Sequence, residues 1–168
     1  MRPIWVKIGI MDFLWSPWRM QYVEGDKEPK CCVFCHALDL PVDSESLIID
    51  RGKSAFVLLN RFPYTTGHLM VVPYQHIQSL DLLDVETRGE LIEITSHALE
   101  VLRQVYKPDG FNVGVNIGSA AGAGVVGHVH IHIVARWAGD TNFMSTLGET
   151  RVLPEDLAKT YQRLRAAW

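Results

Sequence analysis

The sequence lacks features that mark several large classes of protein. No apolar run approaches the ~20 residues that a membrane-spanning helix needs, so we expect no membrane partner. The first residues show no succession of charged, apolar and small-residue regions typical of a signal peptide. Cysteine is scarce, with three residues in 168. We therefore expect a cytoplasmic protein whose cysteines are thiols or metal ligands rather than disulfides.

An excess of positive charge is also missing. Lys and Arg number 16 against 19 Asp and Glu, which gives a net charge of −3 with histidines neutral. Proteins that bind a nucleic acid polymer usually present a clearly basic surface to its phosphates. We therefore expect no nucleic acid polymer as a partner. A pocket for a single nucleotide stays possible, because a few local donors suffice for it.

Length and composition favour one domain. A chain of 168 residues, 48% of them hydrophobic, is long enough to bury a substantial core. Repeats and low-complexity tracts are absent. Three of the five tryptophans lie in the first 30 residues. We predict an aromatic leader at 1–30, of which 1–10 would be an upstream extension before Met11, and a single domain at 31–168.

Hydrophobic periodicity predicts an α+β fold. Apolar residues at spacings of three and four indicate a long helix at 81–106, with Asp84 as a candidate N-cap. A second helix is expected at 153–168. The expected strands are 47–50, 53–60, 68–76 with an end near Pro73, 111–118 and 127–137. We predict a mostly antiparallel sheet of about five strands packed with the long helix and the C-terminal helix.

The most informative stretch is GHVHIHIVARW, residues 127–137, in which every second residue from 128 to 132 is histidine. In a strand, His128, His130 and His132 share one face, roughly 7 Å apart at ~3.4 Å of rise per residue. The alternating Val and Ile residues share the other face, where a helix would bury them. Clustered histidines indicate a site. One zinc held by all three is disfavoured, since ligand nitrogens must converge to ~2.0–2.1 Å from the ion.

A second candidate site lies in CCVFCH, residues 31–36, which contains Cys32-x-x-Cys35. This spacing is half of a typical zinc site and needs two more ligands. The residues alone leave open a pair of reduced thiols. Cys31 or His36 would also be available as a ligand in place of another.

Together these motifs resemble the histidine-triad (HIT) family. HVHIHIV is similar to its signature, LNRFPYTTGHLMVVPYQH (59–76) to its nucleotide-binding hairpin, and VNIGSAAGAG (115–124) to its Asn-x-Gly strand and phosphate loop. LWSPWRMQYV and ARWAGDTNFM resemble a bacterial branch of the family described as diadenosine tetraphosphate phosphorylases. The resemblance implies a HIT-like fold and a homodimer, for which the leader and Trp168 are candidate interface residues unless they pack within the subunit.

The resemblance also implies an enzyme and its reaction. Such an enzyme cleaves dinucleoside polyphosphates, such as diadenosine tetraphosphate, at the α-phosphate through a covalent nucleotidyl-histidine. His130 matches the nucleophile, with a backbone carbonyl near His128 as the acceptor for its other ring nitrogen. His132 matches the histidine that donates to the phosphate or bridging oxygen, and His68 one that braces the triad. Phosphate or water would accept the nucleotide, and the sequence does not separate a phosphorylase from a hydrolase.

Further residues match the binding positions of the family. Asn60 matches a ribose contact, although an Asn before RFPYTTG is equally typical of a turn. Asn116 matches a phosphate or ribose contact. Backbone N–H groups at Gly118, Gly122 and Gly124 are expected to face phosphate oxygens. The run Gly124-Val125-Val126-Gly127 departs from the Gln-Ser or other hydroxyl that many members carry there.

For the metal, the resemblance implies a structural zinc. Its ligands would be Cys32, Cys35, His76 and His128. Two alternatives to the leading function remain: a nucleoside phosphoramidate hydrolase, and a nucleotide-binding protein with little turnover.

Overall fold

The fold was analysed in a computed structural model, which describes residues 32–140 and 155–168. Five strands joined by four antiparallel pairings form one sheet with the strand order β1-β2-β3-β5-β4. The predicted α+β fold with five strands is confirmed. The leader at 1–30, Cys31 and Pro154 lie outside the described residues, so the proposed boundary at residue 31 stays a prediction.

The elements lie close to where periodicity places them. In chain order they are α2 (Val33–Asp39), α3 (Asp43–Ser46), β1 (Ile48–Arg51), β2 (Ala55–Leu59), β3 (Leu69–Pro73), η1 (Leu80–Leu82), α4 (Val85–Tyr106), β4 (Gly110–Val115), η2 (Ser119–Ala121), β5 (Ile131–Arg136) and α6 (Leu157–Ala167). The third strand ends at Pro73 as predicted. Asp84 caps α4, since its carboxylate accepts from the N–H of Thr87 at 2.7 Å.

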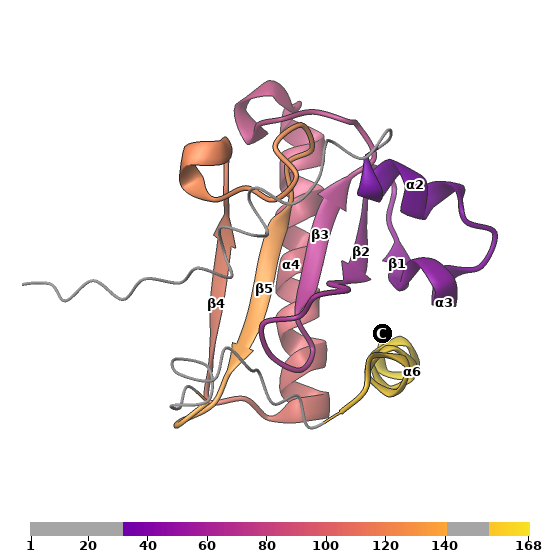
Figure 1. The fold of residues 1–168 in the computed structure, drawn as a ribbon, viewed down its shortest axis with the longest axis vertical. Helices are drawn as coiled ribbons and strands as arrows, with labels where there is room; N and C mark the ends of the chain where they lie inside the picture. Colours follow the sequence, from indigo (N-terminus) through magenta and orange to yellow (C-terminus); the bar gives the residue numbers. More distant parts are fainter. Residues whose placement is uncertain (1–31, 141–154) are drawn as a thin grey trace, which may run out of the picture.

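Helices cover both faces of the sheet (Figure 1). On one face, α4 and α6 pack on a core that includes Ile49, Val57 and Val71. On the other face, α2 packs on Phe56, Leu58 and Val72 through Phe34 and Ala37. This two-sided cover explains why every residue of β2 and β3 is buried. An alternating pattern is absent from these strands for the same reason.

The short helix α2 is not predicted from the sequence. It has seven residues and its N-cap residue, Cys32, makes no capping hydrogen bond through its side chain. A helix of this length is not stable alone, so its stability comes from tertiary packing rather than from a local signal. The four-residue helix α3 (Asp43–Ser46) is likewise not predicted from the sequence.

The histidine segment differs from the prediction in one respect. Regular strand begins only at Ile131, so His128 and His130 precede β5 and His132 alone lies within it. The alternation nevertheless holds, because Val129, Ile131 and Ile133 all enter the core beneath α4. The ring centroids of His130 and His132 are 4.7 Å apart, closer than ideal strand spacing. The two rings therefore act as direct neighbours.

Two further findings bear on the expected partners. Among the described residues, no helix is both long and apolar enough to cross a membrane. Trp168 packs within the subunit, where its ring meets that of His97 on α4 at 4.7 Å between centroids. Trp168, one of the two candidate interface features, therefore packs within its own subunit, which is the alternative given above.

Candidate functional site

The ring of His130 is held by the backbone carbonyl of His128. Its Nδ1 lies 2.9 Å from the carbonyl oxygen of His128. A carbonyl can only accept, so Nδ1 carries the proton and Nε2 keeps its lone pair. The side chain is buried, and this burial lowers the pKa of His130 below its ordinary value. The site therefore presents a neutral imidazole with a fixed nucleophilic nitrogen.

His128 is fixed in a similar way but faces another direction. Its Nε2 lies 2.9 Å from the carbonyl oxygen of Pro73, at the end of β3, and must donate to it. The lone pair is therefore on Nδ1, which lies 3.3 Å from Sγ of Cys32 and 3.8 Å from Sγ of Cys35. The ring is fully buried. The tautomer required of a metal ligand is thus set by a backbone carbonyl.

Four side chains converge at this point and could hold a metal ion. Cys32, Cys35, His76 and His128 each offer a ligand atom, and these atoms all lie within 4.8 Å of one another. A tetrahedral ion with bonds of about 2.3 Å to sulfur and about 2.0 Å to nitrogen separates these ligands by roughly 3.6 Å. The sulfur–nitrogen distances of 3.3, 3.4 and 3.8 Å are close to that value. The donor set and its spacing fit such an ion.

Neighbouring residues support this cluster. The backbone of residue 127 passes so close to His76 that a Cβ on Gly127 would lie 3.2 Å from its Nε2. The opposite ring nitrogen, Nδ1, faces Cys35 at 3.4 Å. His36, an alternative ligand from sequence, is exposed on α2 and is not a member of the cluster. Cys31 lies outside the described residues.

His132 and His68 form a second ordered pair. The backbone N–H of Tyr64 donates to Nδ1 of His68 at 3.1 Å, so this nitrogen accepts. Nε2 of His68 therefore carries the proton, and it lies 3.0 Å from Nδ1 of His132. As a result, Nδ1 of His132 accepts, and the neutral ring carries its proton on Nε2. His132 is thus prepared to donate, the reverse of His130.

The environment of His132 keeps it neutral. Burial, followed by the charge of the neighbouring His130, lowers its pKa to about 4 from the ordinary 6.5. The hydrogen bonds act in the same direction, because a proton on Nδ1 of His132 would face the N–H of His68. A neutral donor beside a neutral nucleophile suits the attack on a phosphate ester.

The expected nucleotide-binding residues are distributed around these histidines. The side chain of Asn60 approaches Nδ1 of His68 at 3.3 Å and also accepts from the N–H of Phe62, so it shapes the turn. Asn116 follows β4, and its amide lies 3.5 Å from the carbonyl oxygen of Gly122.

The glycine-rich loop is only partly open to a phosphate. Gly118 and Gly122 have φ values of 83° and 81°, a region that favours glycine. The N–H of Gly122 already donates to Ser119 at 2.9 Å, so this residue shapes the loop rather than offering its own N–H. Val125 packs against the apolar cluster around Phe34, which accounts for an apolar residue at this position.

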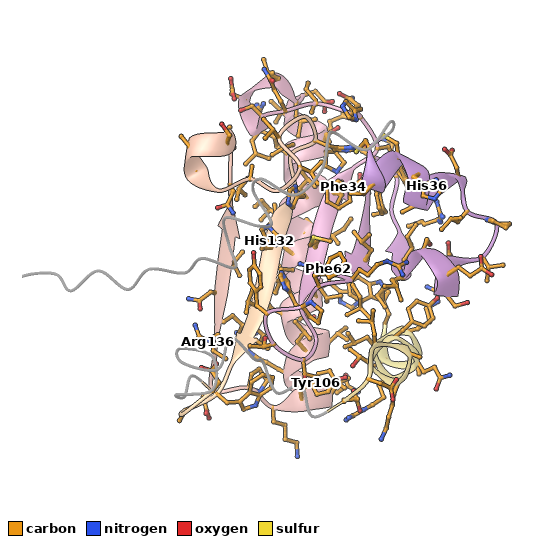
Figure 2. All side chains as sticks on the ribbon, viewed as in Figure 1. Phe34, His36, Phe62, Tyr106, His132 and Arg136 are labelled. Atoms are coloured by element: carbon orange, nitrogen blue, oxygen red, sulfur yellow. The ribbon has the colours of Figure 1, made fainter. Side chains whose placement is uncertain are left out.

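Two residues at the site are missed by the sequence analysis. Phe34 from α2 packs on the rings of His128 and His130, with centroids 5.4 and 4.8 Å away. Tyr64 packs on the rings of His68 and His132. Figure 2 shows Phe34 and His132 on the face of the sheet turned away from α4. The only sign of these two residues in the sequence is that each is an aromatic residue inside a motif already singled out, Phe34 in CCVFCH and Tyr64 in RFPYTTG.

Comparison with known proteins identifies the family. A sequence profile described as the HIT domain matches residues 42–139. The AP-4-A phosphorylase of Mycobacterium tuberculosis is 40% identical over 163 residues, covering 92% of this chain and 83% of that protein.

Solved structures agree on the fold. A zinc-bound histidine triad family protein from Mycobacterium smegmatis is 30% identical with a TM-score of 0.64, covering 81% of this chain and 91% of that one. A Hit-like protein from Bartonella henselae has a TM-score of 0.66 at 20% identity, covering 85% of this chain and all of that one. The sheet and helices described above are therefore the HIT fold.

The environment of His132 predicts its titration. Its ring should remain neutral at pH 5.5 and titrate near a pH of about 4. Because the folded pKa lies below the unfolded value of 6.5, acidification between these two values should favour the unfolded state. Above pH 6.5 this group should have no effect on stability. Nitrogen-15 NMR of the imidazole rings measures the titration directly. A midpoint near 6.5 for His132 would contradict the hydrogen-bond assignment.

Proposed function

Because the chain belongs to the HIT domain family and is an enzyme of that family, we propose that it cleaves dinucleoside polyphosphates at the α-phosphate through a nucleotide bound covalently to His130. Diadenosine tetraphosphate is the preferred candidate substrate. The M. tuberculosis relative, named for AP-4-A phosphorolysis, supports this substrate class.

One observation carries the proposal: the 2.9 Å bond between Nδ1 of His130 and the carbonyl oxygen of His128. An imidazole that attacks phosphorus needs a lone pair on one nitrogen and a proton on the other, with that proton held by an acceptor. The bond supplies both conditions before any substrate binds. A histidine that only contacted nucleotide would not need a fixed tautomer.

The first half of the reaction transfers the nucleotide to the enzyme. Nε2 of His130 attacks the α-phosphorus and forms an N–P bond, while the bond from phosphorus to the bridging oxygen breaks. The N–H at Nε2 of His132 donates a hydrogen bond to the departing oxygen and stabilises its developing negative charge, and the group leaves as a nucleoside polyphosphate anion. The carbonyl of His128 stabilises the positive charge that develops on the His130 ring.

The second half releases the nucleotide. Inorganic phosphate or water attacks the same phosphorus and the N–P bond breaks, so the ring of His130 leaves as a neutral imidazole that keeps its Nδ1 proton, and the attacking group releases its excess proton to solvent. With diadenosine tetraphosphate, phosphate yields ADP and ATP, whereas water yields AMP and ATP. His68 has the role of a positioning residue in both halves, since it holds Nδ1 of His132 at 3.0 Å.

Nucleotide binding is assigned to the two asparagines and the glycine-rich loop. Asn60 would contact ribose and Asn116 ribose or phosphate. Gly118 and Gly124 would offer backbone N–H groups to phosphate oxygens, and Gly122 would maintain the turn between them. We place the enzyme in the cytoplasm, where the thiols of Cys32 and Cys35 would stay reduced and available as ligands.

The metal is proposed to be a structural zinc. The four-residue cluster supplies two thiolates and two imidazoles, the closed tetrahedral set typical of structural zinc. The zinc-bound M. smegmatis relative supports this identity. The ion would join α2 to the end of β3 and to the segment preceding β5, and it takes no part in the chemical steps.

A homodimer is proposed from two neighbouring surfaces. Among the described residues, β4 pairs with β5 along one edge and with no strand along the other. Val113 on β4 is exposed by 47%, and Ile92 on the outer side of α4 by 58%. Helix α4 carries a stripe with the 4-3-4 spacing of helix packing, at residues 85, 89, 92 and 96. Gly89 and Ser96 in this stripe are small enough for a second helix to approach closely. A two-fold pairing of β4 and α4 would cover both surfaces.

The proposed nucleophile is tested by His130→Asn, which should keep nucleotide binding and lose turnover by at least about 1,000-fold. Products from diadenosine tetraphosphate, with and without inorganic phosphate, are separated by chromatography: ADP with ATP indicates phosphorolysis, AMP with ATP hydrolysis. His97→Asn, an exposed histidine on α4, is the matched control and should retain wild-type activity. Failure of the wild-type enzyme to process any nucleotide would favour a binding protein.

The zinc site predicts about one equivalent of zinc in protein purified without chelator. Cys32→Ser should remove the metal and lower Tm by more than about 5 °C, since a chain of this size loses roughly 2–4 °C per kcal/mol. His36→Gln, a change on the same helix outside the cluster, should alter neither quantity. Elemental analysis measures the zinc content, and calorimetry measures Tm. Less than about one-third of an equivalent of zinc, with Cys32→Ser as stable as wild type, would refute the site.

If the protein is a homodimer, its mass in solution should be near twice that of the 19.0 kDa chain. Combining Ile92→Glu with Val113→Lys should place charges on both surfaces and yield a monomer. Glu93→Lys, an exposed change next to the stripe, serves as the control. Light scattering coupled to size exclusion measures the mass. A wild-type monomer at high micromolar concentration would contradict the proposal.

A further inference from the structure

The connection between β2 and β3 places an aromatic ring over the donor histidine. Tyr64 packs on His68 with centroids 4.6 Å apart, and on His132 with centroids 6.1 Å apart and planes 24° from parallel. Its residue surface is exposed by 45%, so the side chain lies between the histidine pair and solvent. Removing the ring would admit water to both histidines.

The same residue also fixes the proton positions of the pair. The N–H of Tyr64 can only donate, and it donates to Nδ1 of His68. For His132 to become protonated on Nδ1, His68 would have to move its proton from Nε2 to Nδ1, where it would meet the N–H of Tyr64. The amide of Asn60, 3.3 Å from the same nitrogen, opposes this change as well. The donors therefore follow one direction: the N–H of Tyr64 donates to His68, and the N–H of His68 donates to His132.

We propose that Tyr64 is a positioning residue whose ring and backbone N–H together keep His132 neutral, oriented and protonated on Nε2, ready to donate to the leaving oxygen. This inference rests on the proposed role of His132 in the reaction. It assigns to the β2–β3 connection a task besides nucleotide contact: setting the protonation state of the donor. The hydroxyl of Tyr64 is not required for either effect.

Of the residues around His132, Tyr64 is the one whose substitution can test the inference. The titratable groups that meet its ring are His68 on the β3 side, His130 in the preceding segment and Tyr64 in the connection. His68 and His130 belong to the proposed reaction itself. Tyr64 is half exposed, so it can be truncated without a cavity in the main core.

The test compares Tyr64→Ala with Tyr64→Phe, using the full-length protein without nucleotide. Nitrogen-15 NMR of the His132 ring should show the Nε2–H tautomer in wild type and in Tyr64→Phe. In Tyr64→Ala the pKa of His132 should rise by roughly one unit or more as water enters, while the backbone N–H of residue 64, which the variant retains, should preserve the Nε2–H tautomer. Core amide signals report whether the variant is folded.

Kinetics provide the second readout. In Tyr64→Ala, kcat should fall about 10- to 100-fold with a smaller change in KM, and its pH profile should shift toward neutral pH. Tyr64→Phe should match wild type. A folded Tyr64→Ala in which His132 keeps the wild-type pKa, or a change of tautomer in a variant that retains the backbone N–H of residue 64, would overturn the inference. If the NMR changes occur but wild type processes no nucleotide, the positioning by Tyr64 stands and the proposed function fails.

Discussion

The structure depends most on the fixed ring and backbone of His128. Its Nε2 donates to the end of β3, its Nδ1 faces the two cysteine sulfurs, and its carbonyl accepts from His130. One buried residue therefore connects the central strand, the metal cluster and the proposed nucleophile. A shift of its backbone would move the acceptor that sets the tautomer of His130. The four-ligand cluster is placed where it resists such a shift.

The remaining two histidines of the segment carry opposite tautomers for physical reasons. The acceptor beside His130 is a carbonyl, so its proton lies on Nδ1 and Nε2 keeps its lone pair. The partner beside His132 is a donor, ordered by the N–H of Tyr64 through His68, so its proton lies on Nε2. Identical side chains two residues apart thus present a lone pair in one case and an N–H donor in the other. The polarity of the backbone groups around them makes the difference.

Sequence patterns predicted the fold and most of the site because these depend on periodicity and spacing. Alternation placed the Val and Ile residues of the histidine segment under α4. Spacing indicated Cys32 and Cys35, the family resemblance added His76 and His128, and the fold brings these four residues together. Helix α2 and Phe34 were missed because a seven-residue helix is stabilised by distant contacts. The tautomers, and with them Tyr64, were beyond prediction because they depend on single hydrogen bonds between residues 64, 68 and 132.

The most direct test of the central claim is to trap the nucleotide on the protein. Wild-type enzyme is mixed with excess diadenosine tetraphosphate in the absence of inorganic phosphate, quenched within milliseconds at alkaline pH, and examined by intact and peptide mass spectrometry. A covalent step predicts an adenylylated protein that forms as fast as turnover, with the added mass on the ring of His130. Rapid product formation with no adduct at any time, or an adduct on another residue, would contradict it.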